Sequence, residues 1–313
     1  MANRTDRLSA QRISARTILQ SRLFTYRTRQ QVWGLLFALP AVTLFAVFAI
    51  YPIIQTFYIS FFDYDLVNTP DYVGMGNYET IFDSPIFINS IRFTFVYAFG
   101  TYIPTLILAL ILALTLNSRL PFRGFWRMMN FIPVVISWVV VSVVWKLMFH
   151  RNGLFNAGLD SLGLMTPDWL LSTNYAPFAI IIPSIWKELG FYMVIFLAGL
   201  QNIPNVYYEA SKIDGASSLQ SFRFITVPLL RPTIALAIVI SLIEGLKVFI
   251  PPFVMTQGGP AGTTRVMALI IYQTAFANGR FGRASAMAVI LFLIILSITL
   301  IQNRLYGTRR DIY

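Results

Sequence analysis

Hydrophobic residues are gathered in long runs along this chain, and polar residues fall in the segments between them. Six runs reach the length of about twenty residues that a helix needs to cross the hydrocarbon core of a membrane. They cover residues 33–56, 92–116, 128–149, 176–199, 232–255 and 284–302. Prolines inside these runs are expected to kink the helices, because groups on neighbouring helices can satisfy the freed carbonyls. The pattern predicts an all-α membrane protein with six transmembrane helices.

One further apolar segment, Val266–Phe276, is too short to cross a membrane. It is expected to be a re-entrant or interfacial piece on the outer side. Neither an internal repeat nor a low-complexity linker divides the chain. We therefore expect one membrane domain over residues 32–302, between terminal tails formed by residues 1–31 and 303–313.

The polar segment 201–231, between the fourth and fifth runs, has the pattern of a short amphipathic helix followed by a turn. Apolar residues recur there at a spacing of three to four. They are Ile203, Val206, Tyr207, Ala210 and Ile213. Asn205 is expected to cap this helix. Gly215 is expected to end it, because glycine accepts the left-handed conformation that follows many helices.

A second short helix is expected after this turn. Ser217 or Ser218 can cap it, and Pro228 and Pro232 are expected to end it before the next apolar run. Its apolar side is formed by Leu219, Phe222 and Ile225. The pattern fits a helical hairpin at a membrane surface, and it fits equally well a plain loop with two helical turns.

Composition supports a membrane protein and excludes an ordinary soluble domain. Hydrophobic residues make up 57% of the 313 residues, charged residues only 12%, and mean hydropathy is +0.66. Soluble domains carry about a quarter charged residues. The net charge of +11 is not expected to indicate nucleic-acid binding, because the basic residues lie mainly beside apolar runs. Cysteine is absent, which excludes disulfides and thiol chemistry.

Basic residues also predict the orientation, since lysine and arginine collect on the cytoplasmic side. Residues 1–31 hold seven arginines and one acid, without the cleavage pattern of a signal peptide. An amino terminus on the inside also places most other basic residues there, together with segment 201–231 and the carboxyl terminus. The expected outer side holds Arg151, Arg265, Arg280 and Arg283, with Arg92 at a span edge. The last outer loop therefore departs locally from the rule.

Enzyme chemistry is not expected of this chain. It lacks the phosphate-loop motif with its lysine, and the glycine-rich Gly258–Gly262 is better explained as a turn. The single histidine, His150, has the position of a helix-end residue. Carboxylates do not cluster with the spacing of metal ligands, so neither a metal site nor a cofactor bound by this chain is expected.

Two pairs of charged residues lie near the middle of apolar runs. Lys187 and Glu188 are in the fourth run, and Glu244 and Lys247 are in the fifth, at a spacing that allows them to pair. Charges at this depth usually face a bundle interior or an aqueous cavity. They either neutralise each other and pin helices together, or line a solute path. In the second case Trp186, Tyr192, Phe249 and Gln257 would supply stacking faces and hydrogen bonds.

The hairpin resembles the EAA loop of membrane subunits of bacterial ABC importers. The matching residues are Glu209, Ala210, Ser211, Asp214, Gly215, Ala216, Phe222, Ile225 and Pro228. Ser211 and Val227 depart mildly from the alanine and leucine of the family pattern. Further likeness to the sugar-importer branch is carried by Tyr51-Pro52, Gly74-x-Gly76-Asn77-Tyr78, Phe131-Ile132-Pro133 and Thr256–Pro260.

The resemblance implies a type I ABC importer transmembrane-domain fold in a bacterial cell membrane. The hairpin would dock on a dimer of ATPase subunits that binds ATP and Mg, with Glu209 contacting a basic or polar group there. A second homologous permease subunit would complete the pore. An extracytoplasmic solute-binding protein would deliver a carbohydrate to a surface formed by Asp63–Asp83, residues 150–175 and Gln257–Arg283. Membrane lipid would surround the spans.

Other functions remain open at this stage. On the same fold the solute could be glycerol phosphate, a polyol or a compatible solute. A secondary carrier driven by an ion gradient would also use buried charges, but the docking hairpin and the lack of an internal repeat argue against it.

Overall fold

The computed structural model describes residues 30–118 and 121–307, and it divides into two units. Most of the two predicted tails lies outside these residues, but residues 30–31 and 303–307 are described and helical. The first unit, as far as Tyr58, is formed by an apolar helix that spans Gln30–Ile59 and confirms the first predicted span. A π-helical turn, η1 (Ala46–Ile50), lies within this helix and is followed by α2 (Tyr51–Ile59).

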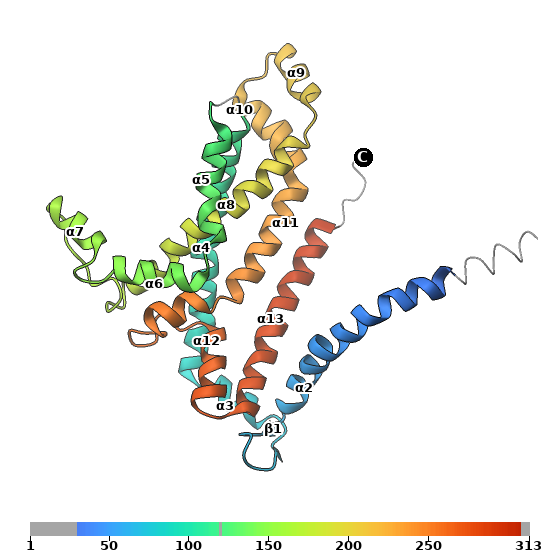
Figure 1. Cartoon of the computed structure of the whole chain (residues 1–313), viewed down its shortest axis with the longest axis vertical. Helices are drawn as coiled ribbons and strands as arrows, with labels where there is room; N and C mark the ends of the chain where they lie inside the picture. The colour runs from blue at the N-terminus through green and yellow to red at the C-terminus, as the bar shows by residue number, and fades with distance from the viewer. Residues whose placement is uncertain (1–29, 119–120, 308–313) are drawn as a thin grey trace, which may run out of the picture. The chain divides into compact units, whose positions relative to one another are not determined.

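The second unit, from Ile59 onward, is a bundle of long helices with short elements at both ends (Figure 1). Its elements are β1 (Phe62–Asp63), β2 (Asp71–Tyr72), α3 (Gly76–Phe82), α4 (Pro85–Asn117), α5 (Arg123–Val135), α6 (Trp138–Met148), α7 (Leu154–Ser161), α8 (Ala176–Gln201), α9 (Asn205–Ile213), α10 (Ser218–Ser221), η2 (Phe222–Thr226), α11 (Val227–Leu246), η3 (Pro252–Thr256), α12 (Met267–Tyr272), η4 (Gln273–Ala277) and α13 (Phe281–Gly307).

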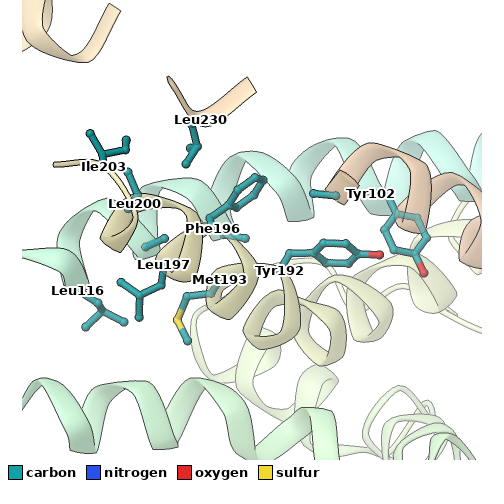
Figure 2. Packing of buried hydrophobic residues seen from close by; sticks show 12 residues of the cluster. Tyr102, Leu116, Tyr192, Met193, Phe196, Leu197, Leu200, Ile203 and Leu230 are labelled. Carbon is teal, nitrogen blue, oxygen red and sulfur yellow. The ribbon is translucent and has the colours of Figure 1, made fainter. Parts of the chain in front are cut away.

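The largest core lies where α4, α8 and α11 pack together (Figure 2). Small residues allow the helices to approach closely. A Cβ at Gly199 of α8 would overlap Thr233 of α11, and a Cβ at Gly245 of α11 would overlap Ala98 of α4. Because lipid gives helices no hydrophobic reason to associate, such close packing is what holds a membrane bundle together.

The predicted third span, 128–149, is not a straight helix. Its two parts, α5 and α6, meet at an angle of 95°. Ile136 is extended at the junction, and Ser137 caps α6 by accepting a hydrogen bond from the Val139 N–H at 3.3 Å. A kink at the proline was predicted here, and the structure instead breaks the span into two helices. Pro133 lies three residues before the junction, inside the last turn of α5.

The predicted fifth span, 232–255, was wrong at both ends. The helix begins at Ser218, within the polar segment, and ends at Leu246. Pro228 lies in the first turn of α11 and Pro232 lies inside that helix, so neither ends it as we expected. The π-helical turn η2 precedes Pro228, and the Thr226 hydroxyl donates to the Ser221 carbonyl at 3.4 Å. Such turns and hydroxyls accommodate bonds that proline cannot make.

The end of the unit opposite α9 and α10 is built from β1, β2, α3, α12, η4 and the start of α13 (Figure 1). Phe62 pairs with Tyr72 in the two-stranded sheet. The buried Asn77 donates to the carbonyls of Ser60 and Phe62 at 3.0 and 2.9 Å. The short apolar helix Met267–Ala277 packs on α13 and α4 at this end and covers the predicted short segment.

Candidate functional site

The hairpin predicted for residues 201–231 is present. The first helix, α9, ends as predicted at Gly215, where φ is +75°. The Ala216 N–H donates to the Ser211 carbonyl, and the Gly215 N–H donates to the Lys212 carbonyl. This pair of hydrogen bonds is the Schellman motif of helix ends. Asn205 does not cap α9, because Pro204 occupies the cap position and no side chain bonds there. That prediction was wrong.

Ser217 caps the second helix, as one of the two expected candidates. Its hydroxyl accepts from the Gln220 N–H at 3.3 Å, and the Gln220 side chain accepts from the Ser217 N–H at 2.7 Å. This reciprocal capping box satisfies two donors at the helix start. The turn between α9 and α10 is thus fixed at both sides by local hydrogen bonds.

Two contacts between hydroxyl groups join the helices of the hairpin. The Tyr208 and Thr226 hydroxyls lie 3.0 Å apart, and those of Ser211 and Ser221 lie 3.2 Å apart. Ser211 is buried and also donates to the Tyr208 carbonyl at 2.9 Å. Tyr208, Ser221 and Thr226 were not among the predicted residues. The sequence gives one signal for these contacts: hydroxyl-bearing residues recur at helical spacing before the turn and again after it.

The outward face of the hairpin combines an acid with apolar side chains. Glu209 and Ala210 are exposed, as are Asp214 and Gly215 in the turn. Its exposed large apolar side chains are Val206, Tyr207, Ile213, Leu219 and Phe224. Phe222, Ile225 and Pro228 are partly buried. Ile213 is 87% exposed although it is fully apolar. Apolar side chains this exposed on a polar hairpin are typical of a surface that receives a partner.

A cavity of 190 Å³ lies at the other end of α11 and brings four of the predicted pathway residues together. They are Glu188, Glu244, Lys247 and Phe249. Tyr97 and Tyr102 of α4 and Trp138 at the start of α6 line it as well. Glu244 and Lys247 form the expected ion pair at 3.2 Å, with about half of each side chain exposed. Charges, hydroxyl groups and aromatic faces therefore meet in one hollow.

The remaining pathway residues lie elsewhere. Lys187 is buried and donates to the carbonyls of Pro133 and Val134, at 3.3 and 3.1 Å, at the end of α5. Trp186 packs against Trp145 with ring centroids 5.7 Å apart. Tyr192 is buried in the core against Tyr102 (Figure 2). Gln257 lines a different cavity, of 670 Å³, beside Trp169 and His150.

Aromatic side chains continue from the first cavity toward the far end of the bundle. Phe249 stacks on Phe253 with ring centroids 5.1 Å apart, and both contact Tyr272 at 5.3 and 5.4 Å. Tyr272 contacts Phe276 at 5.2 Å, and Phe276 contacts Phe281 at 5.7 Å. Only Phe249 of this series was predicted. The others are spaced in the sequence like ordinary core or lipid-facing residues.

The segments expected to receive a binding protein are held by local hydrogen bonds. In the loop between the strands, the backbone and side chain of Asn68 and the backbone of Val67 donate to Asp65, which lowers the pKa of its carboxyl. In the 150–175 segment, Trp169 donates to Asn156 at 3.0 Å. Among the residues that the structure describes, no group of three or more potential ligands is placed to hold a metal ion.

Comparison with known proteins gives a family for most of the chain. Residues 87–310 match the model of the binding-protein-dependent transport system inner membrane component. The trehalose/maltose transport system permease protein MalF of Thermococcus litoralis is 36% identical over 285 residues, which are 90% of this chain and 96% of that protein. The arabinooligosaccharides transport system permease protein AraP of Bacillus subtilis is 34% identical, over 87% of this chain and 88% of that protein.

Solved structures show the same fold. A chain of a bacterial ABC transporter involved in the import of the acidic polysaccharide alginate matches with a TM-score of 0.81 and 25% identity. The match covers 93% of this chain and all of the other. A chain of the alginate transporter in complex with a periplasmic protein bound to an alginate pentasaccharide matches with a TM-score of 0.79 and 26% identity, over 90% and 96% of the two chains.

Proposed function

We propose a function for this chain on the basis of its family, because it belongs to the binding-protein-dependent transport system inner membrane components. It is a sugar-branch permease subunit of an ABC importer, with a transport role rather than an enzymatic one, as its named relatives are transport system permeases. We propose that its solute is an oligosaccharide, and that the chain forms half of the pore together with a second, homologous permease.

The observation that carries the proposal is the continuous helix Ser218–Leu246. One end belongs to the exposed hairpin, and the other reaches the cavity that holds Glu244. A helix transmits displacement because each turn is hydrogen bonded to the next. Docking of an ATPase subunit on the hairpin would therefore move residues at the cavity. ATP and Mg would be bound by that partner, since this chain has no phosphate-binding loop.

The cavity and the aromatic series support a carbohydrate as the solute. Sugars present apolar faces that stack on aromatic rings and hydroxyl groups that pair with carboxylates and amines. Glu188, Glu244 and Lys247 supply the polar groups, while Trp138 and Phe249 supply rings. The chain of contacts from Phe249 to Phe281 offers successive stacking faces. A solute-binding protein would deliver the sugar at that far end of the bundle.

Charge reversal at Glu209 tests the coupling. In membrane vesicles that contain the whole importer, Glu209→Lys should reduce ATP-dependent sugar uptake at least tenfold and should reduce the amount of ATPase subunit that co-purifies. Insertion of the chain should not change, because Glu209 is exposed. Lys212→Gln removes an exposed charge from the same helix and is the matched control, with uptake near the original rate. Normal uptake by Glu209→Lys would remove the coupling role.

A further inference from the structure

A second polar cavity lies at the end of the bundle opposite the hairpin. It has a volume of 620 Å³ and is formed by α3, α12, η4, Arg265 and the starts of α4 and α13. Three arginines line it, Arg265, Arg280 and Arg283, together with the hydroxyl and amide groups of Thr80, Ser84, Thr274, Gln273 and Asn278. We propose that this cavity binds a phosphate group, carried by an anionic phospholipid or free in solution. The proposal does not depend on the transported solute.

The charge in this cavity is unbalanced. Among the described residues, none of the three arginines is in an ion pair, and no acidic side chain lines the cavity. Glu79 and Asp83 are the acids nearest in sequence, and both are exposed and absent from the lining. The Nε atoms of Arg265 and Arg283 are shielded from solvent and have no hydrogen-bond partner. Buried donors without acceptors are costly, and the charge of these guanidinium groups adds to the positive potential that an anion in the cavity would meet.

Two long helices begin at the same cavity. Ser84 is the cap residue of α4 and makes no capping bond with its side chain, and Arg283 lies in the first turn of α13. The first amide groups of a helix lack partners within the helix and carry a partial positive charge. The dipoles of these helices add to the positive potential of the three guanidinium groups, although Pro85 has no N–H and the Gly282 N–H already donates to the Tyr64 carbonyl at 3.1 Å. Guanidinium groups also match phosphate oxygens with paired hydrogen bonds.

The surroundings favour a phosphate attached to a lipid. Apolar residues share the lining with the arginines, namely Ile81, Ile86, Ile270 and Met287. Phe82 and Phe276, next to the lining in sequence, are 54% and 69% exposed. The cavity lies at the ends of two helices that are long and apolar enough to span a membrane, and exposed aromatic rings of membrane proteins gather near lipid headgroups. A bound phosphate would also explain why the last outer loop carries three arginines, although basic residues usually collect on the cytoplasmic side.

The test uses the intact importer purified in detergent and mixed with phosphatidylglycerol micelles, with bound lipid counted by native mass spectrometry. Arg280→Gln combined with Arg283→Gln should retain at least fivefold less phosphatidylglycerol than the original protein. Arg92→Gln is the matched control, because Arg92 is exposed and lines a separate cavity of 310 Å³. It should retain lipid at the original level. Equal retention by the double glutamine variant and the original protein would overturn the proposal.

Two more variants separate the site from general damage. Ala277→Trp fills the cavity without removing an arginine and should also reduce bound lipid at least fivefold. Arg280→Lys with Arg283→Lys keeps the charge and should retain more lipid than the glutamine pair. Thermal stabilisation of the original protein by inorganic phosphate, absent from the glutamine pair, would identify free phosphate as the source. Loss of binding-protein capture with lipid retention unchanged would assign the arginines to a protein contact and overturn the proposal.

Discussion

Glu244 and Lys247 form an ion pair that a helix spacing of three predicts, and the structure places it at the wall of a cavity. Each side chain is about half exposed, so the pair adds little to stability. Because the pair contributes so little to stability and lines a cavity, we infer that its main role is to form hydrogen bonds with a solute. The two charged residues of α8 do not form a pair at this cavity. Glu188 lines it, whereas Lys187 donates to the Val134 carbonyl instead.

Replacing both residues separates these roles. Glu244→Leu with Lys247→Leu should change the free energy of unfolding by no more than about 1 kcal/mol. Sugar uptake should fall at least tenfold, because the cavity loses its hydrogen-bonding groups. Glu244→Gln with Lys247→Gln keeps polar groups at the same positions and should retain more uptake than the leucine pair. Uptake and apparent affinity that match the original protein in both variants would leave the pair a structural role alone.

Single residues show where the sequence was informative. Gly215 was identified because only a left-handed position explains glycine between two amphipathic patterns, and its φ of +75° agrees. The partners of Lys187 were not predictable, since they are backbone carbonyls more than fifty positions earlier in the chain. The position of a lysine inside an apolar run shows that it needs a partner. The sequence does not show which backbone groups of another helix are left unpaired.

The bounds of helices were predicted well where a long apolar run determines them. They were predicted poorly where the effect of a proline determines where a helix ends. The four runs at 33–56, 92–116, 176–199 and 284–302 all lie within continuous helices. Pro104 and Pro183 leave α4 and α8 continuous, and Pro232 leaves α11 continuous, whereas α5 ends two residues after Pro133. The effect of a proline depends on which groups satisfy the freed carbonyls, and those groups come from tertiary structure.

Lys187 is a tertiary partner of a different kind for α5, because it bonds carbonyls that the end of the helix leaves without helical partners. It donates to the last carbonyls of that helix, and its ammonium also lies 4.9 Å from the centre of the Trp138 ring, at the start of α6. One side chain therefore contacts both sides of the 95° bend. Trp138 lines the cavity of Glu188, so the bend also determines one wall of that cavity.

Removing this amine should loosen the bend. Lys187→Met removes the side-chain donor to the Val134 carbonyl, whereas the Pro133 carbonyl still accepts from the Ile136 N–H at 3.3 Å. The loss of this partner in the bundle should cost roughly 1–3 kcal/mol and should lower the apparent melting temperature of the purified complex by several degrees. Lys187→Arg should recover most of the loss. Lys146→Met is the control, because Lys146 also donates to a carbonyl, that of Val254, but is exposed. A Lys187→Met protein that melts with the original would show that the bend holds without the amine.

Three candidate sites follow one another along the second unit. The hairpin of α9 and α10 is at one end of the bundle, and the strands with α3 and α12 are at the other (Figure 1). The arginine cavity is lined by α3 and α12, and the cavity of Glu188 and Glu244 is lined by α8 and the end of α11. The basic residues predict an orientation that would place the hairpin in the cytoplasm and both termini on the same side. That orientation remains a prediction.

Labelling of single cysteines measures the orientation directly, because the chain has no native cysteine. Val67 is 88% exposed in the loop between the strands, and Lys212 is exposed on α9. In intact cells a membrane-impermeant maleimide should label Val67→Cys and should leave Lys212→Cys unlabelled until the cells are opened. The reverse result would invert the topology and exclude a cytoplasmic ATPase from the hairpin.

The contact between Gly199 and Thr233 divides the helix Ser218–Leu246 into two arms. At 1.5 Å per residue, Ser218 lies about 22 Å from Thr233 on one side, and Gly245 about 18 Å from it on the other. A rigid rod that pivots at this contact turns a sideways step of about 1 Å at the hairpin into a step of about 0.8 Å at Gly245, in the opposite direction. Pushing the hairpin toward the bundle axis would therefore swing the wall that carries Glu244 away from it.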